Sequence, residues 1–138
     1  MEIKGTPISS VMVKRLVTAK ETDSIDYISN VFSESKVSHL PILDKENILK
    51  GLLSKQDYLS YLKFLSTESS GSTWAKKHTT SFTAKDLMSP SPMVLSPENT
   101  LQEAIEFFVK TKFHCIPIVE KKELVGILSQ FDIIKHIA

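Results

Sequence analysis

Gly51-Leu52-Leu53-Ser54-Lys55-Gln56-Asp57 occurs a second time in this chain, as Gly126-Ile127-Leu128-Ser129-Gln130-Phe131-Asp132. Each copy is a glycine, two apolar residues, a serine, and an aspartate three positions further on. A strand-like apolar segment that runs through Ser-x-x-Asp into an apolar-periodic segment predicts a junction between a strand and a helix. We expect the serine to cap the helix, and the aspartate side chain to accept a hydrogen bond from the serine amide and so complete a capping box. A hydroxyl, a carboxylate and a helix N-terminus are therefore brought together twice.

The composition is that of an ordinary globular protein: 138 residues, 41% hydrophobic, 24% charged, net charge +1. The charges are interspersed without a basic stripe, so we expect no nucleic-acid partner. Apolar runs fall far short of the roughly 20 residues that span a bilayer, and we expect no membrane association. The first residues show no signal-peptide core. Because Cys115 is the only cysteine, no intrachain disulfide can form, which favours a reducing, cytoplasmic location.

The similarity extends beyond the two junctions. Pro41-Ile42 returns as Pro117-Ile118, and Val11-Met12 returns as Leu87-Met88 at the same displacement. One residue is lost in the turn after the proline-bearing segment, and the apolar pattern then continues in step. The chain is therefore two copies of one unit.

Each copy is predicted to contain a strand, a helix, two further strands and a final helix. For the first copy we expect strands at 16–18, 39–43 and 48–53, a helix at 24–35 and a final helix from Ser54. For the second copy we expect strands at 93–95, 114–119 and 123–128, a helix at 100–111 and a final helix from Ser129. Thr100-x-x-Glu103 supplies a capping box for the second copy's first helix. Pro41 and Pro117 cannot donate to a ladder, so each should lie at a strand end or edge.

A Ser/Thr-rich stretch, residues 66–72, separates the copies. It carries too little apolar surface to form a packed core, so we expect it to be a linker. We assign domain 1 to residues 1–65, a linker to 66–83 and domain 2 to 84–138. Trp74 lies in this linker, followed by Lys76, Lys77 and His78. It either covers a hydrophobic gap or lies in a subunit contact.

These motifs resemble a tandem pair of cystathionine-β-synthase (CBS) domains, as in stand-alone CBS-domain proteins. The resemblance rests on the Val-Met and Leu-Met openings, on Leu40-Pro41-Ile42 and Ile116-Pro117-Ile118, and on the Gly-h-h-Ser-x-x-Asp junctions. It covers roughly Ile8 to Leu65 and Ala84 to Ala138. It implies an α+β fold of tandem β-α-β-β-α units, packed sheet to sheet about a pseudo-two-fold axis with two clefts. Such clefts commonly hold AMP, ADP, ATP or S-adenosylmethionine, and the pairs commonly form homodimers.

The resemblance also implies nucleotide-binding residues. Asp57 and Asp132 would accept hydrogen bonds from ribose hydroxyls, and Ser54 and Ser129 would lie near the ribose or phosphate, at a helix N-terminus suited to anions. Residues expected along the adenine are Val17, Thr18, Ile42, Met93, Val94 and Ile118. Residues expected towards the phosphates are His39, His114 and Lys55. The alternative is that each Ser/Asp pair only caps its helix.

The polyphosphate site departs from the family pattern. Members that bind nucleotides often place His or Arg just ahead of the proline pair, whereas this chain has Ser38-His39 and His114-Cys115 there. Histidine is mostly neutral near pH 7 and holds a polyphosphate less firmly than a guanidinium does. AMP, ADP or an adenosine compound with an uncharged tail is therefore favoured over ATP. Lys55 in one copy and Gln130 in the other make the two clefts chemically unequal.

Catalytic and metal-binding interpretations are disfavoured. Cys115 lies on a predicted buried strand, where a free cysteine is usually a small hydrophobe. Its neighbour His114 should point to the opposite face, so the two cannot easily form a dyad. The four histidines show no metal-ligand spacing.

The sequence thus predicts a regulatory module that binds an adenosine nucleotide and signals to a partner, with no cofactor required. The partner would be a second copy, as a homodimer, or an effector protein. The alternative is a structural dimerisation module with vestigial clefts. A small enzyme is the least favoured interpretation, because the chain shows no set of nucleophile, base and orienting residue.

Overall fold

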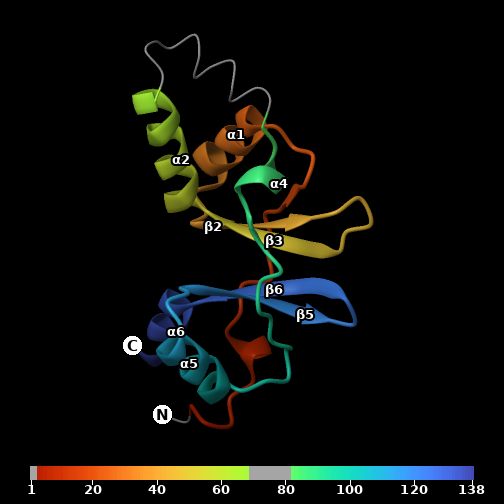
Figure 1. Ribbon diagram of the computed structural model, residues 1–138. Helices are drawn as coiled ribbons and strands as arrows, with labels where there is room; N and C mark the ends of the chain where they lie inside the picture. Colours follow the sequence, from red (N-terminus) through yellow and green to blue (C-terminus); the bar gives the residue numbers. More distant parts are fainter. Residues whose placement is uncertain (1–2, 69–81) are drawn as a thin grey trace. The chain divides into compact units, whose positions relative to one another are not determined.

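The computed structural model describes residues 3–68 and 82–138, without the side chains of 65–68. The chain divides into two compact units (Figure 1). Unit 1 comprises Met1–Leu16 with Pro92–Ala138, and unit 2 comprises Val17–Ser91. The predicted α+β class and the division into two units are confirmed.

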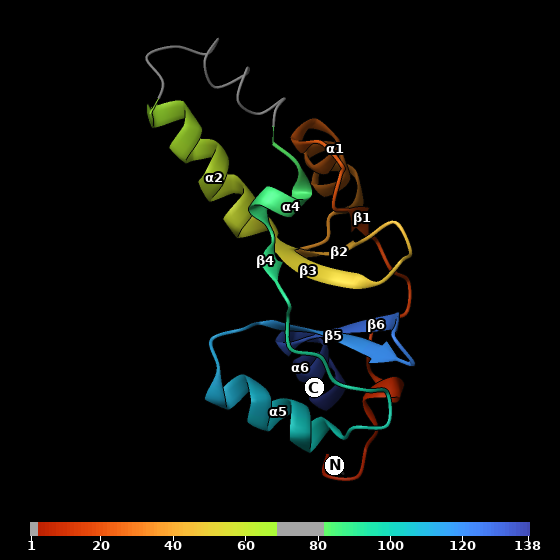
Figure 2. The same ribbon diagram turned by 45° about the vertical axis from the view of Figure 1, so that its right-hand side comes forward.

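Unit 2 is a four-stranded sheet in the order β1-β2-β3-β4, where β1 runs parallel to β2 and the other neighbours are antiparallel. Its strands are β1 (Ala19–Lys20), β2 (His39–Leu43), β3 (Leu49–Ser54) and β4 (Ser89–Pro90), and its helices are α1 (Ile25–Ser35), α2 (Lys55–Glu68) and α4 (Ala84–Leu87). The three helices lie on the same side of the sheet (Figures 1 and 2). The core between them includes Ile28 and Phe32 of α1, Leu40 and Ile42 of β2, and Tyr58 of α2.

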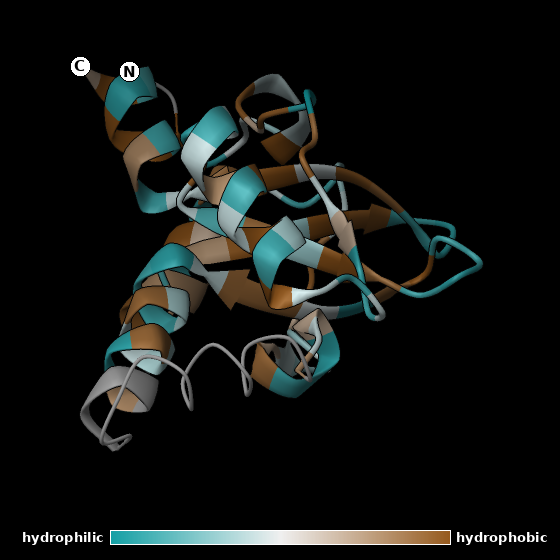
Figure 3. Cartoon of the chain, turned by 90° about the horizontal axis from the view of Figure 1, so that it is seen from above, coloured by the Kyte–Doolittle hydropathy of each residue, from teal (hydrophilic) through white to brown (hydrophobic). Residues whose placement is uncertain are grey.

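Unit 1 repeats this plan around β5 (Cys115–Glu120) and β6 (Glu123–Ser129), an antiparallel pair. Its helices are α5 (Leu101–Lys110), α6 (Gln130–Ile137) and a 3-10 turn, η1 (Ile8–Ser10). Its core residues are Ile8, Leu101, Ala104, Phe108, Ile116, Ile118, Leu128 and Ile133. In both units the helices carry alternating hydrophobic and hydrophilic bands (Figure 3), as expected for helices with one buried face.

The predicted helices and the hairpin strands are confirmed to within a residue or two at each end. Ser24 caps α1 by accepting a hydrogen bond from the Tyr27 amide at 3.1 Å. Thr100 and Glu103 form the predicted capping box of α5. These helix starts were predictable because a cap is a local hydrogen bond between residues three apart in sequence.

The predicted strands at 16–18 and 93–95 are misplaced. The ladder starts only at Ala19, and in the second copy at the single bridge Leu95↔Ile118. The Leu95 amide donates to the Pro117 carbonyl at 3.3 Å, and the Leu95 carbonyl accepts from Val119 at 2.9 Å. Extending this parallel ladder back to Met93 would require an amide hydrogen on Pro117, which proline lacks. In unit 2, Ala19 lies opposite Ile42, so extending the ladder back to Val17 would likewise require an amide hydrogen on Pro41.

The predicted linker is partly helical, because α2 continues to Glu68. Residues 69–81, which include Trp74, Lys76, Lys77 and His78, lie outside the described part of the chain.

The compact units and the sequence repeats do not coincide, because the opening segments of the two copies are exchanged. In the first copy's opening, Ile8 is fully buried in the core of unit 1 and Val13 bridges Ile127. In the second copy's opening, Ala84 is fully buried in the core of unit 2, and β4 pairs with β3. The domain limits at 1–65 and 84–138 follow the repeats and stay a prediction.

Candidate functional site

The first junction cluster consists of Ser38, His39, Ser54, Lys55 and Asp57, where β2 begins and β3 passes into α2. His39 lies opposite Ser54 in the antiparallel register, and the Lys55 amide donates to the Ser38 carbonyl at 2.8 Å. The Ser54 hydroxyl accepts from the Asp57 amide at 2.9 Å. Ser38 Oγ and His39 Nδ1 lie 3.0 Å apart. A carboxylate, a lysine and an imidazole thus gather around one helix N-terminus.

The second junction cluster consists of His114, Cys115, Ser129, Gln130 and Asp132, at the equivalent place in unit 1. Cys115 lies opposite Ser129, and the Gln130 amide donates to the His114 carbonyl at 3.1 Å. The Ser129 hydroxyl accepts from the Asp132 amide at 3.1 Å, and an Asp132 carboxylate oxygen accepts from the Ser129 amide at 2.8 Å. This is the reciprocal capping box expected for both junctions.

The two aspartates differ in what their carboxylates bind. The Asp132 side chain is half-buried and is engaged in its capping box. The Asp57 side chain is exposed, and within residues 3–68 and 82–138 its carboxylate oxygens accept no hydrogen bond. Only half of the predicted box therefore forms at the first junction, which leaves both oxygens of Asp57 available to a ligand.

The two predicted phosphate-facing histidines do not occupy equivalent positions. His39 and Cys115 are the residues that lie opposite the capping serines. His114 corresponds instead to Ser38, since the carbonyl of each accepts a hydrogen bond from the amide of the first residue of the following helix. The His114 side chain is exposed. This difference follows from aligning the proline pairs, Leu40-Pro41 with Ile116-Pro117, and it makes the first cluster the more basic one.

The predicted adenine residues fall into two groups. The side chains of Ile42 and Ile118 are fully buried in their cores, so their backbone is the part that could reach a ligand. Val17 and Thr18 are half-buried, whereas Met93 is 62% exposed and Val94 is 42% exposed. Because the prolines end the ladder, the backbone groups of these four residues make no hydrogen bond to other described residues. In each unit, one pair of these residues therefore leaves backbone donors and acceptors for a heterocycle.

Cys115 is a packing residue in this arrangement. Burial, and secondarily the Asp132 carboxylate, raises the pKa of its thiol to about 12. The nucleophilic form of a cysteine is the thiolate, so this thiol is a poor candidate for catalysis near neutral pH. Within the described residues no three His, Cys, Asp or Glu side chains gather in a way that could hold a metal ion.

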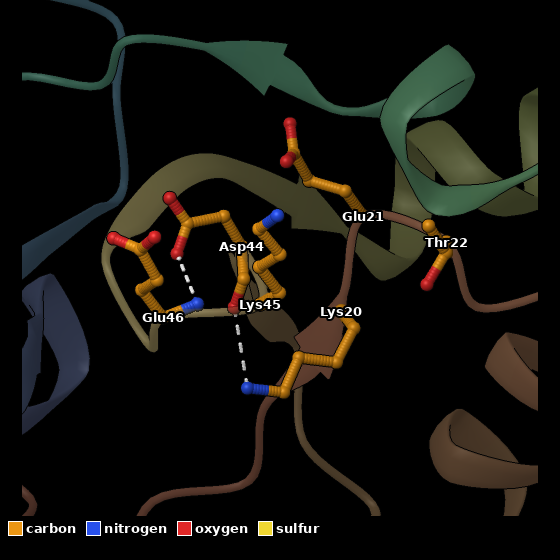
Figure 4. Close-up of a pocket in the computed structure, with 6 residues that line it drawn as sticks. All are labelled: Lys20, Glu21, Thr22, Asp44, Lys45 and Glu46. Carbon is orange, nitrogen blue, oxygen red and sulfur yellow. Dashed lines mark hydrogen bonds between the residues drawn. The ribbon is translucent and has the colours of Figure 1, made fainter.

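A hollow of about 600 Å³ lies elsewhere in unit 2, at the turn between β2 and β3 (Figure 4). It is lined by Lys20, Glu21, Thr22, Asp44, Lys45 and Glu46. Asp44 Oδ1 accepts from the Glu46 and Ile48 amides at 2.8 and 3.0 Å, and Lys20 Nζ donates to the Asp44 carbonyl at 3.3 Å. The amide of Ile48 is the main cause that lowers the pKa of Asp44. These bonds shape the turn itself, and none of the predicted site residues lines the hollow.

The CBS domain family model matches residues 8–63 and 84–138. The chain therefore belongs to the CBS-domain family and carries the domain twice in tandem. It is 28% identical over 151 residues to the CBS domain-containing protein CBSX2, chloroplastic, of Arabidopsis thaliana, covering 95% of this chain and 63% of that protein. It is 27% identical over 148 residues to CBSX1, chloroplastic, of the same plant, covering 93% of this chain and 62% of that protein.

The crystal structure of CBSX2 in complex with AMP matches the fold with a TM-score of 0.79 and 28% identity, covering 96% of both chains. The chain spans less than two thirds of the length of the curated CBSX relatives. No helix in the described ranges has the length and hydrophobicity needed to cross a membrane.

Proposed function

We propose that this CBS pair is a regulatory module that binds an adenosine nucleotide and prefers AMP or ADP to ATP or S-adenosylmethionine. Ligand binding would change its conformation, and the module would transmit this change to a partner. The observation that carries the proposal is the exposed carboxylate of Asp57, which accepts no hydrogen bond from residues 3–68 and 82–138 and lies at a helix N-terminus beside Lys55 and His39. A carboxylate accepts two hydrogen bonds from a ribose diol. A helix N-terminus and a lysine favour an anionic phosphate.

The relatives support the choice of ligand. CBSX2, at 28% identity, has been crystallised in complex with AMP. A nucleotide with one or two phosphates suits a cluster with one lysine and one histidine and no arginine, because each added phosphate would need further positive charge.

The two junctions would differ in preference. The first offers a lysine, a histidine and a free carboxylate, which suits a phosphate-bearing adenosine compound. The second offers glutamine and cysteine in the corresponding places, and its carboxylate is partly engaged. We propose that it takes an adenosine compound with an uncharged tail, or none.

A thermal-shift screen of ligand-free protein against AMP, ADP, ATP and S-adenosylmethionine tests the ligand class. A ligand at 100 times its Kd should stabilise the fold by about 2.7 kcal/mol. If no adenosine compound raises the melting temperature, the alternative of a structural dimerisation module with vestigial clefts is favoured.

Asp57→Asn tests the site, with Asp132→Asn as the matched control at the second junction. Losing a hydrogen-bonded charge typically costs about 1.5–3 kcal/mol, so AMP affinity should fall roughly 10- to 100-fold in Asp57→Asn and less in Asp132→Asn. Titration calorimetry measures both. Unchanged affinity in Asp57→Asn, in a wild-type protein that binds AMP, would remove Asp57 from the site.

We also propose that the partner of the module is a second copy of the chain, with an effector protein as a further partner. Equivalent positions of the last helices carry exposed apolar residues, Leu59 in α2 and Ile134 in α6, which are 50% and 60% exposed. Apolar side chains at the same place on both repeats suit a symmetric contact. A non-enzymatic role in the cytoplasm completes the proposal, although the CBSX relatives are chloroplastic by name.

A further inference from the structure

Each glycine of the repeated junction motif lies against a methionine. In unit 2, Gly51 on β3 faces Met88, which follows α4. In unit 1, Gly126 on β6 faces Met12, which follows η1. Met12 and Met88 are the second residues of the repeated Val-Met and Leu-Met openings, so two separate sequence motifs meet at this contact.

A β-carbon on either glycine would force the methionine side chain to shift. A β-carbon on Gly51 would lie 2.6 Å from Met88 Cγ and closer still to its sulfur. A β-carbon on Gly126 would lie 2.5 Å from Met12 Sδ and 2.9 Å from its Cγ. Neither glycine has a positive φ. The need for glycine is therefore a need for space and not for backbone freedom.

Each contact joins residues of different repeats, because the opening segments are exchanged. Next to Met88, β4 pairs with β3, with Pro90 opposite Gly51. Next to Met12, Val13 and Ile127 exchange backbone hydrogen bonds of 2.8 and 3.0 Å. The methionine thus fills the space above a glycine at the point where an incoming opening segment first pairs with the strand.

We propose that these two Met–Gly contacts are positioning devices that set the register in which each exchanged opening segment docks. The candidate adenine segments follow a few residues later, Val17 and Thr18 after Met12, and Met93 and Val94 after Met88. The glycine itself is followed by the serine and aspartate of the junction. The consequence for ligand affinity rests on the proposed function, whereas the effect on docking does not.

A four-way comparison of melting temperatures tests the docking in the full chain: wild type, Gly51→Ala, Met88→Ala and the double variant. Overpacking typically costs about 1–3 kcal/mol, so Gly51→Ala should lower the melting temperature by roughly 3–10 °C. In the Met88→Ala background the same glycine change should be neutral or stabilising, because the space is then empty. Gly126→Ala should likewise lower the melting temperature in the wild type and be neutral or stabilising in the Met12→Ala background.

Gly5→Ala is the matched control, since a β-carbon at Gly5 has no atom within 4 Å. It should leave the melting temperature unchanged in both backgrounds. If Gly51→Ala does not fold, recovery of the fold on adding Met88→Ala supports the proposal equally well. An unchanged melting temperature in Gly51→Ala, or an equal loss with and without Met88, would overturn the proposal.

AMP affinity distinguishes positioning from general stability. Ile28→Val removes one methyl from a fully buried core residue of α1, which lowers stability without adding an atom at the Met–Gly contact. We expect Gly51→Ala to weaken AMP binding severalfold and Ile28→Val to leave it unchanged, at a temperature where both are folded. A wild type that binds no adenosine compound would reject the proposed function, and the melting comparison would still decide the Met–Gly proposal.

Discussion

Asp57 and Asp132 are the same residue type at the same repeat position, yet the Asp57 carboxylate is exposed and accepts no hydrogen bond from the described residues, whereas the Asp132 carboxylate closes a capping box. The difference separates a stabilising role from a binding role, because a carboxylate that already accepts a backbone hydrogen bond has less capacity for a ribose. The motif alone cannot show this difference, since both copies read Ser-x-x-Asp.

The difference predicts unequal stabilities for matched alanine variants. Asp132→Ala should lower the free energy of unfolding by about 1 kcal/mol, because it removes the acceptor for the Ser129 amide. Asp57→Ala should change it by less than about 0.5 kcal/mol, as for an exposed surface residue. Urea denaturation of both variants measures the contrast. Equal losses would mean that the first junction is capped like the second.

Cys115 predicts a specific pH dependence. Its pKa is raised to about 12 in the folded chain, against 9.0 for an ordinary thiol. Below pH 9 neither state ionises, so this thiol adds no pH dependence. Between about pH 9 and 12 the unfolded chain loses the proton and the folded chain keeps it. The stability contribution of Cys115 should therefore fall by up to about 1.4 kcal/mol per pH unit.

Comparison of wild type with Cys115→Ala between pH 8 and 10.5 isolates this contribution from that of tyrosine and lysine. The difference in unfolding free energy between the two proteins should be constant below pH 9 and shrink above it. A thiol reagent should also react with the native protein far more slowly than with the unfolded one. Rapid reaction at pH 8 would contradict the burial of the thiol.

At the scale of elements, the predictable parts were those specified by neighbours in sequence. The helices of both repeats could be placed because their apolar residues recur at helical spacing, and because Thr100 and Ser129 cap helices through residues three positions away. The first strand of each repeat was misplaced because its extent depends on Pro41 and Pro117, which belong to a different strand. The candidate site residues could be named, and aligning the proline pairs already sets His39 against Cys115, but the hydrogen bonding of the two aspartate carboxylates required the structure.

The exposed apolar face of the last helices predicts the oligomeric state of the chain. Ile134→Asp should convert a dimer into a monomer while changing monomer stability little, because Ile134 is 60% exposed on α6. Light scattering after size-exclusion chromatography measures the mass. Lys45→Asp, which changes charge on the exposed turn between β2 and β3, serves as the control. A wild type that is already a monomer would contradict the homodimer.

At the scale of the whole molecule, the boundary between independently packed parts does not follow the repeat boundary. Residues 17–91 form one continuous unit that contains α4 and β4, whereas residues 1–65 lack both. The sequence repeats could not predict that the opening segments are exchanged. The two repeats would be equally similar in sequence whichever unit each opening segment packs on.

Two fragments of similar length test this organisation. The fragment 17–91 should fold with a cooperative thermal transition, because it keeps Ala84 in its core and β4 on its sheet edge. The fragment 1–65 should be less stable or unfolded, since it carries the opening segment of the other unit instead. Circular dichroism melts of the two fragments measure the contrast. A more stable 1–65 fragment would show that the repeat is the folding unit.

The exchanged openings also govern when the protein can fold during its synthesis. Ile8 and Val13 leave the ribosome long before Ile127, the residue that Val13 bridges. That segment must stay unpaired until Ile127 has emerged, and closing so long a loop is entropically slow. Unit 2, by contrast, is complete once β4 has been made. During synthesis unit 2 can therefore fold first, and unit 1 can close only after β6 has emerged.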